Sequence, residues 1–389
     1  MTWQVFSYDP SVLRRSNRHA LASPYLTIDL DKIEHNTQAV VSLCQSHGIE
    51  VTGVTKGVCG QPELARAMLR GGISSLADSR MENIHRLQAA GIHTRYMLLR
   101  LPALSGVEEV VGMIDVSVNS EIAVVDALSK IACRRGTVHD VMLMVELGDL
   151  REGIPPDELL PFVRAVMQFP GIRIQGIGTN LACFGGVVPS TDNMTRLVEL
   201  ASAVEKLVGY SLEWISGINS SGLDLLVAGE TPKRINHARI GEAILLGRET
   251  VHRRPWPDTF QDAFLLHAEI LELKKKPSLP VGARSEDAFG ELPEFQDRGE
   301  MRRALLNVGR EDVVIEGMTP IDPQVRILGA SSGYLVVDVT RADKTYGVGD
   351  ELSFSLNYAS LLRVSTSEYV KNRSFQSGTQ SSDQGHASV

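Results

Sequence analysis

The chain has 389 residues, of which 43% are hydrophobic and 22% charged, as in an ordinary soluble globular protein. This length is too great for one small domain and suits a large barrel with a second unit. The formal net charge of −8 at pH 7 argues against a surface for nucleic acid or an anionic membrane.

The termini and the cysteines favour a cytoplasmic protein. Residues 1–24 are polar, lack the charged and apolar regions of a signal peptide, and predict an irregular arm. No apolar run approaches the roughly 18 to 20 residues that a membrane span needs. The cysteines have neither CxxC spacing nor nearby histidine pairs, so we interpret them as reduced thiols and expect no metal site: Cys44, Cys59, Cys133 and Cys183.

Residues 25–255 alternate between strand-like and helix-like segments, which predicts a (β/α)8 barrel of the TIM type. The first strand, Tyr25–Leu30, can instead join the second domain. The expected barrel strands are Val51–Lys56, Ser74–Ser79, Thr94–Leu99, Val116–Asn119, Val141–Leu147, Ile172–Asn180, Glu213–Asn219 and Ile235–Ile240. The helices expected between them include Gln61–Arg70, Met81–Ala90, Glu121–Arg134, Pro156–Gln168 and Asn193–Val208.

Residues 256–370 change to short strands between Gly, Pro and Asp turns, with few helix signals, and predict a mainly-β C-terminal domain. Residues 371–389 are rich in Ser, Gln and Gly, and predict a disordered tail. The fold class is therefore α/β, with a barrel followed by a β domain.

The candidate functional residues follow the expected barrel strands, where barrels of this kind carry their chemistry. Lys56 ends the first of these strands, and an amine in an apolar barrel mouth suits a Schiff base or a proton carrier. Arg151 lies in a glycine-flanked loop and suits a carboxylate, which a guanidinium can bind through two hydrogen bonds. Asn180 suits a cofactor ring or a substrate carboxylate. Each also has a plainer interpretation, as a surface lysine, a charge in a solvated loop or a turn asparagine.

The ends of the last two expected barrel strands carry residues that are suited to bind an anion. Ser220 and Ser221 combine hydroxyls with backbone amides, although Ser-Ser-Gly is also common turn chemistry. Arg239 ends the last strand, before free amides at Gly241 and Glu242. The alternative for Arg239 is a salt bridge with Glu242 or Glu249.

Together these motifs resemble those of the barrel-type (fold type III) pyridoxal-phosphate enzymes, the group that contains alanine racemase. The resemblance is closest to the ornithine and broad-range amino-acid racemase branch and covers about Tyr25 to Val370. It rests on Thr-Lys56-Gly, Glu-Leu-Gly-Asp-Leu-Arg151-Glu-Gly, Gly-Thr-Asn180-Leu-Ala-Cys, Asn219-Ser-Ser and Ile-Asn-His-Ala-Arg239-Ile-Gly-Glu-Ala-Ile-Leu-Leu-Gly.

The resemblance implies an enzyme that interconverts L- and D-amino acids, ornithine, lysine or a broad range, by proton exchange at Cα. Lys56 would hold pyridoxal 5′-phosphate and act as one acid/base group, and Arg239 would donate to the pyridine nitrogen. Ser220 or Ser221, with the amides of Gly241 and Glu242, would hold the phosphate. Arg151 matches the arginine near the substrate carboxylate, and Asn180 stands where alanine racemase has a histidine.

The chain departs from the alanine racemase pattern at two places. Cys59-Gly60 stands where that enzyme has a tyrosine-glycine pair whose hydroxyl meets the phosphate. The second base of the family is a tyrosine from the β domain of a partner subunit, which implies a homodimer with shared sites, but Pro277–Gly282 contains no tyrosine. The remaining candidates for this base are Asp287, Arg310-Glu311-Asp312 and Tyr358.

Two other functions stay open. A decarboxylase of the same fold would carry a glycine-rich phosphate loop and a Cys-Asp-Gly segment, and the sequence contains neither. A non-catalytic protein that binds pyridoxal phosphate, or a regulatory one, is the alternative that the missing tyrosine supports.

Overall fold

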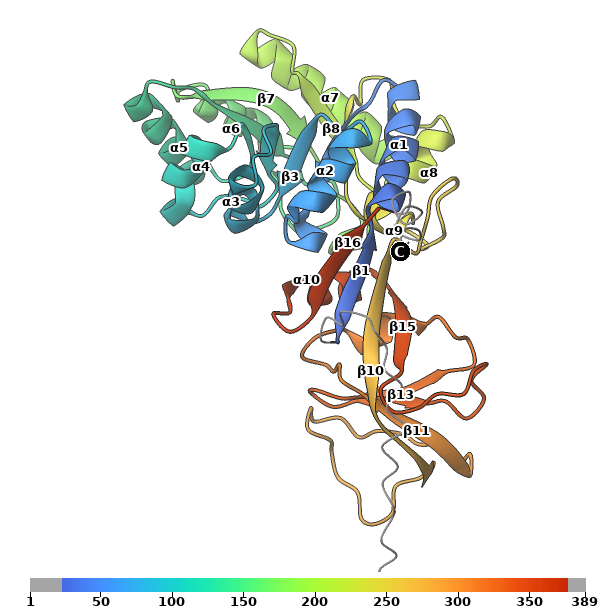
Figure 1. Ribbon diagram of the computed structural model, residues 1–389. Helices are drawn as coiled ribbons and strands as arrows, with labels where there is room; N and C mark the ends of the chain where they lie inside the picture. The colour runs from blue at the N-terminus through green and yellow to red at the C-terminus, as the bar shows by residue number, and fades with distance from the viewer. Residues whose placement is uncertain (1–22, 377–389) are drawn as a thin grey trace, which may run out of the picture.

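The computed structural model describes residues 23–376, which form a closed parallel barrel and a β-rich domain (Figure 1). The tail beyond residue 376 and nearly all of the arm expected over residues 1–24 therefore lie outside the described residues. Within residues 23–376, no helix is long and apolar enough to cross a membrane.

Eight parallel strands close the barrel in sequence order, as predicted. They are β2 (Glu50–Val54), β3 (Ser75–Asp78), β4 (Arg95–Leu98), β5 (Val116–Asn119), β6 (His139–Met144), β7 (Ile172–Gly178), β8 (Trp214–Ile218) and β9 (His237–Ile240). The surrounding helices are α1 (Leu30–Ser46), α2 (Pro62–Arg70), α3 (Met81–Ala89), α4 (Val107–Met113), α5 (Ile122–Arg135), α6 (Leu159–Val166), α7 (Thr191–Val208), α8 (Leu223–Val227) and α9 (Glu242–Leu246).

The barrel interior is filled by alternate residues of these strands, because successive side chains of a strand point to opposite faces. One buried cluster inside the barrel contains Val54, Ala77, Met97, Val118, Met142 and Trp214. Thr52 and Ser216 lie two residues from Val54 and Trp214, so they share the inner face. The interior thus has an apolar layer and a layer of buried polar groups, and the larger apolar cluster packs the helices onto the strands.

The sequence located the strands to within a few residues, with one difference that matters for the site. Lys56 is not the last residue of β2. It opens a short 3-10 turn, Lys56–Val58, after β2 has ended at Val54. Helix α4 was not anticipated, and the short link after β8 holds only the five-residue α8.

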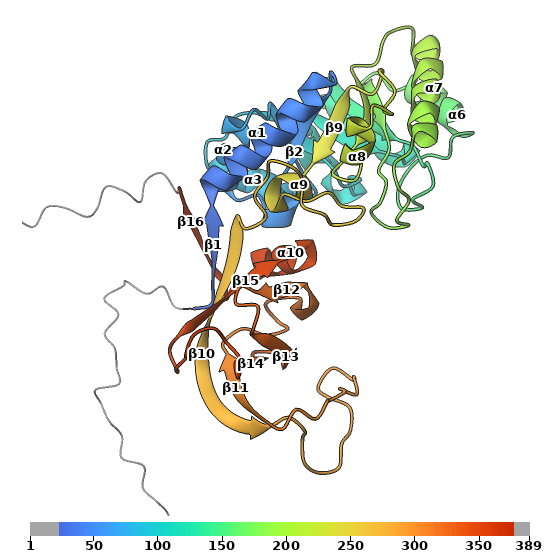
Figure 2. The same ribbon diagram turned by 90° about the vertical axis from the view of Figure 1, so that its right-hand side faces the viewer.

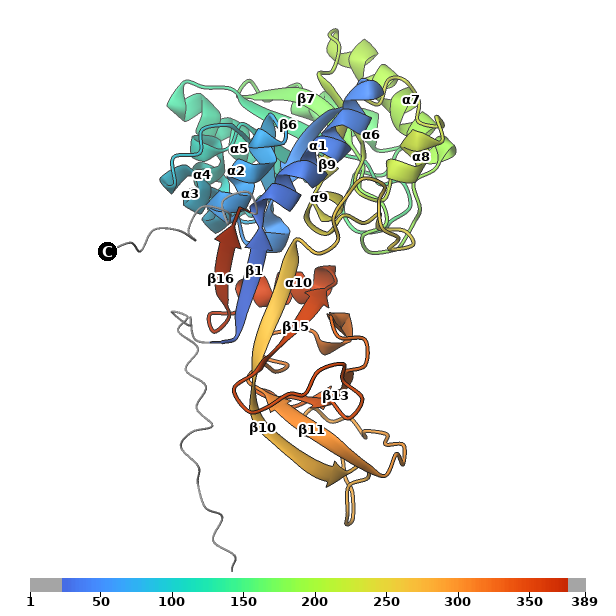
Figure 3. The same ribbon diagram turned by 45° about the vertical axis from the view of Figure 1, so that its right-hand side comes forward.

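The second domain is an eight-stranded sheet with strand order β12-β15-β10-β11-β14-β13, extended at β10 by β1 and β16. Figures 1 and 3 show β16, β1 and β10 side by side between the barrel and the rest of the sheet. The strands are β1 (Tyr25–Asp29), β10 (Phe264–Pro277), β11 (Glu300–Leu306), β12 (Met318–Pro320), β13 (Arg326–Ala330), β14 (Leu335–Asp338), β15 (Glu351–Leu356) and β16 (Lys371–Phe375).

Segments near both ends of the described residues 23–376 enter this sheet. Tyr25–Asp29 pairs with β10 and β16, so this first strand joins the β domain and the barrel begins at β2. Lys371–Phe375 pairs in parallel with β1, which corrects the prediction of a disordered tail from residue 371. The segment Lys-Asn-Arg-Ser-Phe has no apolar alternation, and its backbone pairing with β1 supplies the order that its side chains do not indicate.

A helix that the sequence analysis did not anticipate, α10 (Tyr358–Thr366), lies where the two domains meet (Figure 2). Asn357 caps it by accepting the backbone N–H of Ser360 at 3.0 Å. The Ser360 hydroxyl donates to the carbonyl of Val314 at 2.6 Å and ties the helix to the β domain. The start of α10 therefore has a fixed position at the barrel mouth.

Candidate active site

A cavity of about 630 Å³ opens at the carboxyl ends of the barrel strands. Five cationic side chains line it against two acidic ones, so it has the charge expected of a site for an anionic ligand. The cationic residues are Lys56, Arg100, Arg151, Arg239 and Arg253, and the acidic ones are Glu152 and Glu242. Of the residues predicted from sequence, it brings together Lys56, Arg151, Asn180, Ser220, Arg239, Gly241 and Glu242.

The turn that carries Lys56 is held to β3 by a buried carboxylate. Asp78 accepts the hydroxyl of Thr55 at 2.7 Å and the side-chain amide of Asn83 at 2.9 Å. Burial raises the pKa of Asp78, and these hydrogen bonds oppose the rise. Because Thr55 directly precedes Lys56, Asp78 fixes where the lysine side chain leaves the backbone.

The Cys59-Gly60 pair completes this turn in a left-handed conformation, with φ of 51° and 58°. A Cβ on Gly60 would lie 2.8 Å from the Cβ of Asn83, so a glycine is required there. The Cys59 carbonyl accepts a hydrogen bond from Arg86. This pair therefore closes the turn, and the phenol that packs on the turn, at Gly57, comes from another part of the chain.

That phenol belongs to Tyr358, the first residue of α10, which lines the cavity. Its ring packs on Gly57, where an added Cβ would lie 3.1 Å from Tyr358 Cε2. Burial, followed by the charge of Glu242, raises the pKa of Tyr358 to about 12. The phenol is therefore protonated at neutral pH and available as a hydrogen-bond donor.

Arg151 and Asn180 meet across the cavity. With the Asn180 amide oriented so that its oxygen accepts, that oxygen lies 2.9 Å from Arg151 Nη2. Glu152 accepts from Arg151 Nη2 at 2.5 Å and from its Nε, and this pairing raises the pKa of Arg151. Arg151 is thus a permanently charged group whose plane is set by Glu152 and Asn180.

A buried aspartate joins the loop of Arg151 to the loop of Asn180. Asp149 is 1% exposed and accepts the backbone N–H groups of Cys183 at 3.3 Å, Phe184 at 2.8 Å and Val187 at 3.2 Å. One buried carboxylate thus pairs with three backbone amides of an irregular loop whose side chains are largely exposed.

Arg239 projects from β9 inside the barrel and is 7% exposed. Its Nη2 donates to the carbonyl of Thr179 at 2.6 Å, and its Nη1 donates to the Ser216 hydroxyl. A Cβ on Gly178 would lie 3.0 Å from Nη1, so that glycine leaves room for the guanidinium. Burial lowers the pKa of Arg239 to about 10, which still leaves it protonated at neutral pH.

The two glutamates that the sequence offered as partners of Arg239 are engaged elsewhere. Glu242 pairs with Arg253 at 2.5 Å, and Glu249 pairs with Arg254 at 3.4 Å. The salt-bridge alternative for Arg239 is therefore wrong, since its contacts are with a carbonyl and a hydroxyl.

The predicted phosphate cradle is only partly assembled from the expected residues. Ser220 lines the cavity, and its hydroxyl accepts the backbone N–H of Ala243, at the start of α9, at 3.1 Å. Ser221 turns to Asn219 instead, through both its amide and its hydroxyl. Gly241 packs closely on β2, since an added Cβ would lie 3.1 Å from the Cβ of Val54. Of the two serines, Ser220 is the one at the cavity.

Comparison with known proteins identifies the family. Residues 28–249 match the family described as alanine racemase, N-terminal domain. The ornithine racemase of Acetoanaerobium sticklandii is 40% identical over 349 residues, covering 90% of this chain and 98% of that protein. The chain belongs to the alanine racemase family. The lysine racemase of Thermotoga maritima is 38% identical and covers 90% of this chain and 97% of its own length.

Solved structures of alanine racemases share this fold. The enzyme of Bacillus anthracis superimposes with a TM-score of 0.71 at 16% sequence identity, covering 93% of this chain and 97% of that one. The enzyme of Bartonella henselae, solved with covalently bound pyridoxal phosphate, gives a TM-score of 0.69 at 18% identity, covering 91% of this chain and all of that one. Membership of this family makes the chain an amino-acid racemase with pyridoxal phosphate as its cofactor.

The cavity has the chemistry that this racemase cofactor requires. An aldehyde needs an amine, which Lys56 offers, and a dianionic phosphate needs cations and hydrogen-bond donors, which the lining supplies in excess. The residues that line the cavity therefore fit the cofactor of the family.

Among residues 23–376, no group of three or more His, Cys, Asp or Glu could hold a metal ion.

The structure separates the candidates for the second base. Tyr358 lines the cavity, whereas Asp287 accepts two backbone amides in a β-domain loop, and Asp312 is buried against Ser367. Arg310 pairs with Glu291 at 2.9 Å. Of these candidates within one chain, Tyr358 is the one that lines the cavity.

Sequence reasoning missed several residues that shape the site, namely Asp78, Asp149 and Glu152. Asp78 is the last residue of β3, and Asp149 and Glu152 lie in the glycine-containing loop after β6, so a position at a strand end was the available signal. Their role depends on which amide or guanidinium they face, and local sequence does not carry that information.

Proposed function

We propose that this chain racemises a basic amino acid, ornithine or lysine, at the cavity described above. The observation that carries the proposal is the identity of 40% and 38% with an ornithine and a lysine racemase, each over 90% of the chain. The carboxylates of Glu152 and Glu242 in the cavity lining each pair with an arginine and keep further lone pairs that can accept from a side-chain ammonium. Pyridoxal phosphate, when bound, supplies the electron sink that lets the Cα proton leave.

The roles that we propose for the residues follow from their positions. Lys56 would hold the cofactor through its amine, and the same Nζ would take or return the Cα proton on one face of the substrate. Arg151 binds the substrate carboxylate as a permanently charged group, because Glu152 and Asn180 hold its guanidinium in place at the cavity. Ser220 with the amides of Gly241 and Glu242, and the Tyr358 hydroxyl, donate to anionic oxygens of the ligand.

Arg239 determines which kind of chemistry is favoured. Arg239 keeps its own proton at neutral pH, so it would hold the ring nitrogen of the cofactor as a hydrogen-bond donor without giving up that proton. Held in this way, the cofactor would supply a weaker electron sink, which would favour proton exchange at Cα over side reactions.

Racemisation needs a proton donor on each face of the planar carbon, so we propose a homodimer in which the β domain of a partner completes the site. The loop between β10 and β11 supports this proposal, because it exposes large apolar side chains: Val281 (95% exposed), Leu292 (65%) and Phe289 (44%). The cytoplasmic location expected from the sequence stays a prediction.

The test of function is exchange at Cα. Purified protein with pyridoxal phosphate is incubated in deuterated water with each enantiomer of ornithine, lysine and alanine. We expect deuterium at Cα and loss of optical rotation, fastest with the two basic amino acids. Bound cofactor without exchange would support the binding-protein alternative, and release of carbon dioxide would support a decarboxylase.

A further inference from the structure

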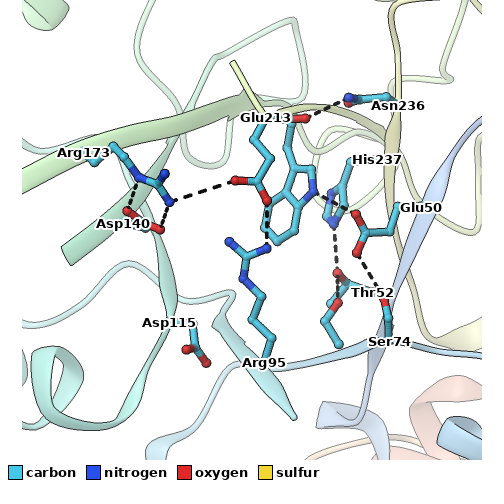
Figure 4. A network of polar contacts seen from close by, with 12 residues as sticks. Glu50, Thr52, Ser74, Arg95, Asp115, Asp140, Arg173, Glu213, Asn236 and His237 are labelled. Carbon is cyan, nitrogen blue, oxygen red and sulfur yellow. Dashed lines mark hydrogen bonds and ion pairs between the residues drawn. The ribbon is translucent and has the colours of Figure 1, made fainter. Parts of the chain in front are cut away.

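A chain of buried polar side chains runs from Arg239 across the inside of the barrel. The Ser216 hydroxyl lies 2.7 Å from His237 Nδ1, and His237 Nε2 lies 2.8 Å from the hydroxyl of Thr52. The Thr52 hydroxyl lies 2.7 Å from that of Ser75. Figure 4 shows His237 directed at Thr52 near the amino-terminal end of the barrel, where Arg95 and Glu213 pair at 2.9 Å.

The hydrogen bonds of this chain have one consistent direction. A guanidinium only donates, so the Ser216 oxygen accepts from Arg239 and its own hydrogen points to His237 Nδ1. Nδ1 then accepts, which places the ring hydrogen on Nε2, where it is donated to Thr52. With His237 neutral in this tautomer, every hydrogen of the chain points away from Arg239.

The surroundings of His237 favour this neutral form. The imidazole is fully buried and stacks on Trp214, with ring centroids 4.2 Å apart. Burial first, and then the charges of Arg239 and Arg95, lower its pKa well below the ordinary value. The guanidinium of Arg95 lies over the ring of Trp214, with its Cζ 4.5 Å from the ring centroid. Both ring nitrogens of His237 are used within the barrel, and His237 is not among the residues that line the cavity.

Arg239 Nη2 donates to the carbonyl of Thr179 at 2.6 Å, and Nη1 donates to the Ser216 hydroxyl, with the Ser216 carbonyl at 3.5 Å and Met142 Sδ at 3.6 Å. The Ser216 hydroxyl is the short contact at Nη1, so together with the Thr179 carbonyl it fixes the plane of the guanidinium, and its loss leaves Nη1 with the two long contacts alone. We propose that Ser216 and His237 are positioning residues that fix the guanidinium plane of Arg239 toward the ring nitrogen of the cofactor. This inference rests on the proposed function of Arg239.

A purely structural explanation exists, since buried polar groups are paired in any fold. The same barrel contains a matched pair that serves as a control. The Ser117 hydroxyl lies 2.8 Å from His139 Nε2, both residues are buried, and Asn119 also donates to the hydroxyl. This pair joins β5 to β6 and makes no contact with Arg239.

The experiment compares Ser216→Ala with Ser117→Ala. Retention of pyridoxal phosphate is measured by equilibrium dialysis at graded cofactor concentrations, together with the absorbance spectrum of the holoenzyme. We expect Ser216→Ala to weaken cofactor affinity by about tenfold and to shift the absorbance maximum, because a hydrogen bond to a charged group is lost. Ser117→Ala should leave both unchanged, and Ser216→Thr should retain the affinity of the unchanged protein.

Equal cofactor affinity and spectra for the two alanine variants would overturn the proposal, and so would a threonine variant as weak as Ser216→Ala. Should Ser216→Ala fail to fold, the tautomer of His237 can be measured by nitrogen NMR of the unchanged holoenzyme. We expect His237 with its hydrogen on Nε2, and a hydrogen on Nδ1 would contradict the chain. None of these measurements depends on turnover, so failure here is distinguishable from failure of deuterium exchange.

Discussion

The ring of Tyr358 packs on Gly57, the residue that follows Lys56, so the β domain reaches the centre of the barrel site. A Cβ on Gly57 would lie 3.1 Å from Tyr358 Cε2 and 3.4 Å from Leu245 Cδ1, and the glycine makes this approach possible. The lysine turn and α10 therefore share a close contact, and the position of one depends on the position of the other.

The first prediction concerns the hydroxyl of Tyr358. A pKa of about 12 keeps this group protonated until the pH approaches that value, so it does not change charge between about pH 6 and pH 9. We expect Tyr358→Phe to raise KM by about tenfold through loss of one donor to an anion. The shape of the profile of kcat/KM against pH should stay the same.

Steady-state racemisation between these pH values checks this expectation. Tyr369→Phe is the control, because that side chain is 69% exposed on the β domain. If Tyr358→Phe removes one limb of the pH profile, the phenol titrates as an acid or base and its assignment as a fixed donor is wrong.

The second prediction is that Lys56→Ala loses covalent attachment of the cofactor. The holoenzyme is reduced with borohydride, and peptides are searched by mass spectrometry for the added phosphopyridoxyl group. We expect the group on Lys56 in the unchanged protein and on no lysine in the variant, because the other cations of the cavity lining are arginines. Lys130→Ala, at an exposed helix position, should label normally. Labelling of another lysine in Lys56→Ala would contradict the assignment.

The barrel could be predicted from sequence because its strands are short runs rich in apolar residues and most of them are followed by a helical pattern. The candidate site residues could be placed at one end of the barrel as well, because Lys56, Arg151 and Asn180 follow such strands and Arg239 lies next to the last residue of β9. Carboxyl ends of parallel strands meet at one face of a barrel, so local pattern alone placed these residues together.

What the sequence did not predict depends on contacts between distant segments. Tyr358 reaches Gly57 only because α10 lies at the junction of the two domains. Lys371–Phe375 is ordered by pairing with β1, although its polar side chains predict disorder. Ser221 has the same chemistry as Ser220 and differs only in facing Asn219. In each case the deciding partner is set by tertiary packing.

The third prediction separates substrate binding from cofactor binding at Arg151. Arg151→Lys keeps the charge but loses the planar fork that pairs with Glu152 and Asn180. We expect KM to rise by about tenfold or more, with the affinity for pyridoxal phosphate unchanged. Arg173→Lys is a matched control, since Arg173 makes a similar two-point contact with Asp140 at the other end of the barrel. Weaker cofactor binding with unchanged KM would show that Arg151 contacts the cofactor and not the substrate.

The last prediction tests whether Asp149 orders the site. Asp149→Ala leaves the amides of Cys183, Phe184 and Val187 without their acceptor, so we expect the free energy of unfolding to fall by about 1–3 kcal/mol. Because Arg151 is two residues further along the same loop, KM should rise as well. Urea denaturation and substrate kinetics measure the two effects.

The control for Asp149→Ala is Asp322→Ala, which removes a carboxylate that accepts the amides of Gln324 at 2.9 Å and Asp343 at 3.1 Å in the β domain. Asp322→Ala should lower stability without raising KM, since its loop is remote from the cavity lining. A loss of stability in Asp149→Ala with unchanged KM would show that the two loops can separate while Arg151 keeps its position. In that case Glu152 and Asn180 alone hold the guanidinium, and the coupling of the loops through Asp149 serves the fold only.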